Sequence, residues 1–237
     1  MDQFNTFVDF VLHVKGVEYL LAIGFMTMFI FFFRYLKSPA AATATAEATA
    51  GAGDRIDGII VPASLFFHRG HAWAQALSPE RARLGLDDFA QKLIGKIGKL
   101  ELPAVGAILN QGQPAWTLVA DGKKVSMLSP VSGKVTRIND QLSGSLDVLN
   151  SDPYGKGWLL EVEAPKNSLT ANLKNLLTKV LAKKWMETSI EELMGQASGN
   201  LGLVSADGAN PVNGMARNLG GENWDRLAKE FFLTEEE

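Results

Sequence analysis

The chain contains no cysteine and only three histidines. Without cysteine there can be no disulfide framework, no thiolate nucleophile and no cysteine-ligated zinc or iron-sulfur site. The absence does not decide the redox compartment, because a chain without cysteine is compatible with either side of a membrane.

The sequence also has no excess of basic residues over acidic ones. The formal net charge is -3 and the isoelectric point is about 5.7. No stretch interleaves basic and aromatic residues as single-strand binders do. We therefore expect no nucleic acid among the partners.

Known catalytic motifs are absent as well. The sequence has no nucleophile elbow, no phosphate-binding loop and no zinc-protease helix. The adjacent Asp87 and Asp88 are better explained as the start of a helix than as an acid/base pair. We predict no catalytic residues, and we do not expect an enzyme.

A long apolar run near the N-terminus is present. Residues 19–33 contain no charged residue, and Glu18 and Arg34 lie near the ends of the wider range 17–36. About twenty apolar residues in a helix span the hydrocarbon core of a bilayer. We predict one transmembrane helix, preceded by an amphipathic interfacial leader, over residues 1–37. A signal peptide is the alternative, but the leader is long and carries Asp2 and Asp9.

The flanking basic residues predict an orientation. Arg34, Lys37 and Arg55 follow the apolar run, whereas Lys15 stands alone before it. The positive-inside rule then favours a cytoplasmic C-terminal side. We expect a single-pass protein of the inner (cytoplasmic) membrane, with the lipid bilayer and integral membrane subunits of a multi-protein complex as partners.

Composition divides the remainder into segments. Residues 38–54 are rich in Ala, Thr and Gly and are expected to form a linker. The range 55–164 predicts a mainly β domain that begins with a single strand over 56–62 and continues with short strands between glycine turns and one helix near 86–94. Apolar residues at helical spacing predict an amphipathic segment over 165–197. Residues 198–237 read as a Gly-rich arm with a short terminal helix, whose apolar side chains we interpret as a docking element.

Four ordered motifs and one early pair resemble a known family. They are His71-Ala72-Trp73, Asp87-Asp88-Phe89-Ala90-Gln91, Leu100-Glu101-Leu102-Pro103-Ala104-Val105-Gly106, Ser129-Pro130-Val131-Ser132-Gly133-Lys134-Val135 with Asn139, and Asn150-Ser151-Asp152-Pro153-Tyr154-Gly155-Lys156-Gly157-Trp158-Leu159. In this order and spacing they resemble the H-protein of the glycine cleavage system. The resemblance implies a lipoyl-type barrel-sandwich hybrid, here with an N-terminal transmembrane helix and C-terminal helices.

The same resemblance draws attention to Gly122. In that family the lysine that carries lipoate lies eight residues before the proline of the Ser-Pro-x-Ser-Gly strand. Here this proline is Pro130, and the residue eight positions before it is Gly122. Lys123 and Lys124 follow and are the fallback lipoyl sites. Because Asp121-Gly122 is a favoured hairpin turn, we expect Lys123 just after its tip and Lys124 on the opposite face. We expect no bound cofactor, with lipoate on Lys123 or Lys124 as the alternative.

His68 and His71 form a His-x-x-His pair that could bind a metal. Because His71 already belongs to the His-x-Trp of the resemblance, we predict no metal site, and a metal-dependent enzyme stays as the least favoured function. The preferred function is a membrane-tethered, non-catalytic accessory subunit of a larger membrane complex, with an electron-transfer complex as one candidate. The alternative is a working lipoyl carrier of the glycine cleavage type.

Overall fold

The computed structural model describes residues 6, 9, 18–19, 21–33, 53–198, 214 and 223–233. The chain divides into two units, Met1–Ala44 and Thr45–Glu237. The predicted linker lies outside the described residues except for Gly53 and Asp54. The predicted C-terminal arm lies outside them except for residues 198, 214 and 223–233.

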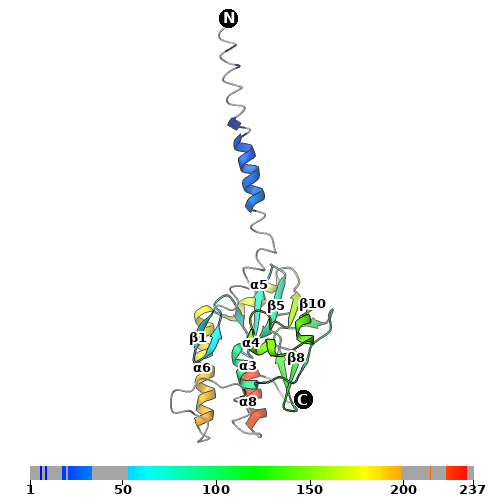
Figure 1. Ribbon diagram of the computed structural model, residues 1–237, viewed down its shortest axis with the longest axis vertical. Helices are drawn as coiled ribbons and strands as arrows, with labels where there is room; N and C mark the ends of the chain where they lie inside the picture. The colour runs from blue at the N-terminus through cyan, green and yellow to red at the C-terminus, as the bar shows by residue number, and fades with distance from the viewer. Residues whose placement is uncertain are drawn as a thin grey trace. The chain divides into compact units, whose positions relative to one another are not determined.

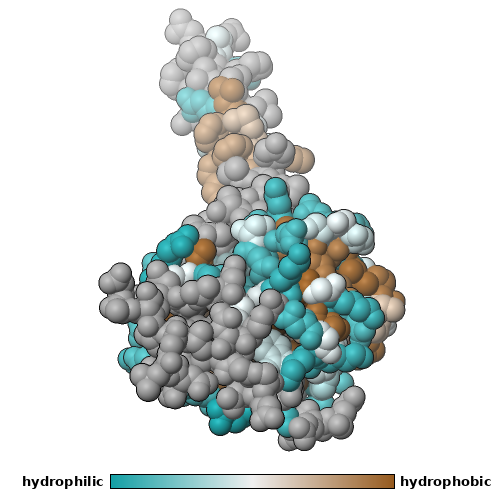
Figure 2. All heavy atoms as spheres, turned by 60° about the horizontal axis from the view of Figure 1, so that its bottom comes forward, coloured by the Kyte–Doolittle hydropathy of each residue, from teal (hydrophilic) through white to brown (hydrophobic). Residues whose placement is uncertain are grey.

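In the first unit, residues 21–33 are helical (blue in Figure 1). Their large apolar side chains are exposed, and brown and tan surface runs along this helix in Figure 2. The predicted membrane helix over 17–36 extends into residues that are not described. Among the described residues, no helix has both the length and the apolar character needed to cross a bilayer.

The second unit is mainly β. Its first half contains β1 (Asp54–Ile56), β2 (Ile59–Val61), β3 (Phe66–Phe67), β4 (Ala72–Ala76), β5 (Arg81–Leu86), α3 (Asp88–Ile94), β6 (Lys99–Glu101) and β7 (Ile108–Leu109). Its second half contains β8 (Pro114–Ala120), β9 (Lys123–Leu128), β10 (Gly133–Ile138), the 3-10 helix η1 (Asp140–Ser143), α4 (Asp147–Ser151), β11 (Leu160–Glu163), α5 (Ser168–Lys174), β12 (Leu177–Thr178), α6 (Lys179–Ser198) and α8 (Asn223–Phe232). The prediction of a mainly β domain followed by C-terminal helices is confirmed.

Two sheets enclose the core. The seven-stranded sheet has the order β12-β3-β4-β5-β11-β10-β7, and the three-stranded sheet has the order β6-β8-β9. Alternate residues of β8 and β9, such as Trp116, Leu118, Val125 and Met127, are buried, as expected for strands with one face on a core. The remaining two strands, β1 and β2, form their own hairpin.

That hairpin corrects one prediction. A single strand is predicted over 56–62, but Asp57 and Gly58 both have positive φ, at 46° and 83°, and turn the chain back on itself. An Asp-Gly pair is a favoured two-residue hairpin turn. The signal was present in the sequence and points to two strands, β1 and β2.

The helix α3 begins where its sequence predicts. Asp87 is the N-cap, and its side chain accepts a hydrogen bond of 2.8 Å from the backbone N–H of Ala90. Gly95 ends the helix with φ 78°. An acidic N-cap and a glycine after the last turn are the expected start and stop signals.

The predicted amphipathic segment over 165–197 is helical over most of its length, but it is not one continuous helix. It is divided into α5 and α6, because Leu177 and Thr178 pair with Phe67 and Phe66 as β12. The interruption also relies on Lys179, which has φ 52°. Strand pairing with β3 therefore overrides a helical apolar pattern that is continuous in the sequence.

The terminal helix α8 belongs to the core. Its apolar side chains are buried, namely Trp224, Leu227, Ala228, Phe231 and Phe232. Phe231 packs on Phe89 of α3 with ring centroids 5.2 Å apart, and α3 and α8 lie next to each other in Figure 1. Our interpretation of these side chains as a docking element for a partner is therefore wrong.

A close approach between Gly85 and Trp73 leads to a stability prediction. A Cβ added to Gly85 would lie 2.5 Å from Cζ2 of Trp73, a fully buried side chain whose Nε1 donates to Leu86 O at 2.8 Å. We expect Gly85→Ala to lower the free energy of unfolding by about 1–3 kcal/mol through overpacking. Urea denaturation followed by circular dichroism measures the change.

Gly195→Ala is the matched control. Gly195 lies in α6, and a Cβ there would meet no atom within 4 Å. The same change should be neutral or stabilise by up to about 1 kcal/mol, since alanine favours a helix over glycine. Equal effects of the two substitutions would contradict the tight packing of Gly85 against Trp73.

Candidate functional site

The hairpin of β8 and β9 ends in the turn Asp121-Gly122. Ala120 and Lys123 are paired directly across it, so the loop contains only these two residues. Both have positive φ, at 51° and 77°, as a type I′ turn requires. The predicted hairpin turn is present, and its tip is Gly122.

Gly122 is exposed and has open space around it. A Cβ built on this residue would have no other atom within 4 Å. A side chain at this position would therefore extend into solvent from the tip of a hairpin. Glycine has no side chain, and so this residue offers no amine to which lipoate could be attached.

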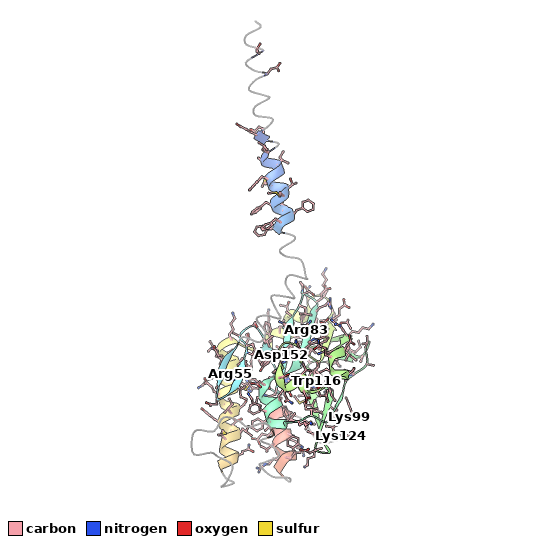
Figure 3. All side chains as sticks on the ribbon, in the orientation of Figure 1. Arg55, Arg83, Lys99, Trp116, Lys124 and Asp152 are labelled. Carbon is pink, nitrogen blue, oxygen red and sulfur yellow. The ribbon has the colours of Figure 1, made fainter. Side chains whose placement is uncertain are left out.

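The two following lysines, Lys123 and Lys124, lie on opposite faces of β9, as the alternation of side chains along a strand predicts. Lys124 is exposed and pairs with Val119, which pairs on its other side with Lys99. Lys123 is half-buried and lies on the strand face that also carries the buried Val125. Figure 3 shows Lys99 and Lys124 at the same end of the domain.

Charges on the outer face of the three-stranded sheet are mixed. Nζ of Lys99 lies 2.7 Å from Oε1 of Glu101. This hydrogen bond lowers the pKa of Glu101, and the positive charges of Lys99 and Lys124 lower it further. Because the side chain of Glu101 is 40% exposed, solvent screens these interactions, which indicates a solvated face and not a reactive site.

A groove of about 450 Å³ lies beside this face, between β6 and residues 138–146. Lys99 is the only charged side chain in its lining, which otherwise consists of glycine, serine, leucine, isoleucine and Asn139. The amide of Asn139 already donates to the carbonyls of Lys156 and Trp158 at 2.7 Å each. The groove therefore offers no pair of acid and base groups.

The histidines and aspartates singled out by the sequence are part of the packing. Nδ1 of His71 lies 2.8 Å from Oδ2 of Asp87, and both side chains are buried. The His71 ring stacks on Phe89 at 4.1 Å and lies 4.6 Å from the Trp185 ring. This pair therefore joins β4, α3 and α6 inside the core.

His68 makes a local hydrogen bond. Its Nδ1 accepts a hydrogen bond of 3.0 Å from the backbone N–H of Gly70. Burial lowers the pKa of His68, and the neighbouring His71 lowers it further. Within the described part of the chain, no three His, Asp or Glu side chains are grouped as a metal ion requires.

Tyr154, from the last motif, connects the same region. Its hydroxyl donates to Ile60 O at 2.6 Å and accepts from the backbone N–H of Asp88 at 2.9 Å. Burial raises the pKa of Tyr154 well above its ordinary value, and the charge of Asp87 raises it further. Its phenol is thus a structural hydrogen-bonding group.

The folded domain also contains a cluster of charged side chains that the sequence pattern does not predict. Arg81, Arg83 and Arg137 gather around Glu161, with Trp158 beside two of them. The available signal was the alternation of arginine with apolar residues in β5. Pairing partners in β10 and β11 could not be read from that local pattern.

The chain is similar to known proteins of one family. The family model described as "Glycine cleavage H-protein" matches residues 65–189. The glycine cleavage system H protein of Mycobacterium avium (strain 104) is 40% identical over 122 residues, which cover 51% of this chain and 89% of that protein. The H protein of Mycobacterium tuberculosis (strain H37Rv) is 31% identical over 121 residues, covering 51% of this chain and 90% of that protein.

Among solved structures, the crystal structure of a glycine cleavage system H protein from Mycobacterium marinum aligns with 48% of this chain and 98% of that chain. Its TM-score is 0.42 and its sequence identity is 20%.

Proposed function

Because the chain belongs to the glycine cleavage H-protein family, we propose that it is a membrane-tethered member that has lost the lipoyl arm and serves as a non-catalytic accessory subunit. The fold of a lipoyl carrier would then be kept as a platform for binding other proteins. Its partners would be integral membrane subunits of a larger complex.

The observation that carries this proposal is the tip of the β8–β9 hairpin. We assign Gly122 to the family's lysine position by counting back from Pro130, and the Asp-Gly turn is complete without an amine. Attachment of lipoate needs a primary amine displayed at the tip, where a long side chain can swing between partner sites. Gly122 cannot provide this amine.

The first unit supports the membrane tether. Residues 19–33 contain no charged residue, and the described side chains of residues 21–33 expose large apolar groups, including Leu21, Phe25 and Phe31. A helix that is apolar on all sides needs burial in lipid or against other helices. The basic residues after this run, Arg34 and Lys37, favour a domain on the cytoplasmic side of an inner membrane.

One observation favours the alternative, a working lipoyl carrier. Lys124 is exposed two residues after Gly122, and Lys123 follows the tip directly. Either amine could in principle carry lipoate and shuttle a group or electrons between enzymes. However, each side chain leaves the hairpin from a strand and not from the tip of the turn, and Lys123 is half-buried.

Extraction of the chain from its native membrane in mild detergent tests the accessory role. We expect the full-length chain to co-purify with integral membrane proteins in stoichiometric amounts. Recovery of the chain in the soluble fraction, without membrane partners, would rule out the tethered subunit.

A further inference from the structure

The outer face of β10, β11 and β5 carries two rows of alternating charge. In one row the register is Arg137, Glu161 and Arg83, and in the next it is Lys134, Glu163 and Arg81. Each row thus places one carboxylate between two basic side chains. We call Arg81, Arg83, Arg137 and Glu161 the arginine cluster.

Two arginines of the cluster occupy the carboxylate of Glu161. Nη2 of Arg81 donates to Oε2 at 2.8 Å, and Arg83 donates to Oε1 from Nη2 at 3.0 Å and from Nε at 3.3 Å. The side chains of Arg83 and Glu161 are 5% and 3% exposed, so this pair is structural. A buried pair of this kind is kept intact by mutual hydrogen bonding and is not open to a ligand.

Arg137 is the third arginine of the cluster, and it does not hydrogen-bond to Glu161. Its Nη1 lies 3.8 Å from Oε1 of Glu161, beyond hydrogen-bonding distance. Within the described residues, its guanidinium donates no hydrogen bond, and its side chain is 55% exposed. The only carboxylate in its row is already bound by Arg81 and Arg83.

Trp158 holds this guanidinium in position. Cζ of Arg137 lies 5.1 Å from the centroid of the Trp158 ring, and Cζ of Arg83 lies 4.9 Å from it. A cation–π contact restricts the arginine side chain but leaves its N–H groups available. Arg137 is therefore a preorganised, half-exposed donor next to Arg81, whose side chain is itself 50% exposed.

We propose that Arg137, supported by the exposed part of Arg81, binds a carboxylate of an acidic segment on a partner protein. This inference rests on the proposed function and names the surface through which the accessory subunit holds a partner. A guanidinium matches a carboxylate with two parallel hydrogen bonds, which adds geometry to charge attraction. The cluster is well separated from the hairpin tip, as the labels of Arg83, Lys99 and Lys124 show in Figure 3.

The alternating rows favour a discrete acidic segment over a uniformly anionic surface. Glu163 is exposed between Lys134 and Arg81, and its carboxylate would repel the closely spaced phosphates of a lipid bilayer or a nucleic acid. The net charge of -3 adds no broad basic field. A protein segment can direct one carboxylate to Arg137 and keep its other groups away from the glutamates.

The test uses the full chain in detergent micelles and a fluorescein-labelled glycine-serine peptide with two adjacent glutamates at its centre, with binding followed by fluorescence anisotropy at low salt. We expect Arg137→Gln to weaken binding by at least about fivefold, because it removes the charge and the paired donors. Arg137→Lys keeps the positive charge but loses the paired donors, so its affinity for the peptide should lie between those of the wild-type and Arg137→Gln chains. Lys174→Gln removes a positive charge from the exposed Lys174 of α5 and should change binding by less than about twofold.

Equal weakening by Arg137→Gln and Lys174→Gln would overturn the site. An unlabelled oligophosphate of matched length serves as competitor. If it displaces the labelled peptide at a much lower concentration than the unlabelled peptide does, and if this also depends on Arg137, the carboxylate assignment fails in favour of a phosphate ligand.

Co-purification separates this inference from the proposed function. If membrane partners co-purify equally with wild-type and Arg137→Gln chains, the arginine cluster is not the partner surface, although the accessory role stands. If peptide binding depends on Arg137 but no partner co-purifies with the wild-type chain, the accessory role fails and the carboxylate site stands.

Discussion

Replacement of Asp87 by alanine is expected to lower the free energy of unfolding by about 3–5 kcal/mol. The carboxylate is fully buried and has two partners: Oδ1 caps α3 through the N–H of Ala90, and Oδ2 lies 2.8 Å from Nδ1 of His71. Truncation removes the cap and also leaves the buried His71 without its polar partner. An unpaired buried polar group accounts for most of the expected loss.

Two further variants identify the source of that loss in urea denaturation. Asp87→Asn keeps a good N-cap but removes the negative charge, and should cost less than Asp87→Ala. Asp147→Ala changes an exposed aspartate in the first turn of α4 and should cost less than about 0.5 kcal/mol. An Asp87→Ala chain as stable as the Asp147→Ala chain would show that the His71–Asp87 pair does not hold the core.

Substitution of Gly122 by lysine is expected to convert the chain into a substrate for lipoate attachment. Nothing lies within 4 Å of a Cβ at this position, so a new lysine would extend from the tip of the hairpin into solvent. The φ of 77° costs a non-glycine residue about 1–2 kcal/mol, which the domain should tolerate. Incubation with a lipoate-protein ligase and lipoate, followed by intact mass spectrometry, measures the conversion.

The wild-type chain and the variants Lys123→Arg and Lys124→Arg are the controls, and all three should remain unmodified. A folded Gly122→Lys chain that gains no lipoyl group would contradict the assignment of residue 122 to the family's lysine position. Modification of the wild-type chain that is lost in one arginine variant would identify the true acceptor.

Local chemistry was sufficient to predict the features around the hairpin tip. Asp121-Gly122 specifies a type I′ turn because both residues tolerate positive φ, and the turn then fixes which strand face each lysine occupies. Asp87 is likewise a local start signal for α3. These features depend on residues that are neighbours in the sequence, so they can be predicted without knowledge of the fold.

Features that depend on distant partners were not accessible. The apolar spacing through residues 169–186 is helical, yet pairing with β3 makes Leu177 and Thr178 a strand. The apolar face of α8 shows amphipathicity but not what covers it, and the structure buries it in the chain's own core, where Phe231 packs on Phe89. Whether such a face meets its own domain or a partner is decided by tertiary packing.

The arginine cluster illustrates the same limit for a site. Arg81 and Arg83 are neighbours in β5, but Arg137 and Glu161 reach them only through the antiparallel register of β10, β11 and β5. A one-residue slip of that register would send the side chains to the other face of the sheet. The charge surplus at Arg137 therefore exists only in the folded domain.

The intact mass of the chain, extracted from the native membrane of lipoate-replete cells, tests the loss of the arm most directly. We predict the mass of the unmodified polypeptide, because Gly122 provides no acceptor and neither Lys123 nor Lys124 lies at the tip of the turn. A stoichiometric lipoyl increment mapped to Lys123 or Lys124 would contradict the account and establish a working carrier.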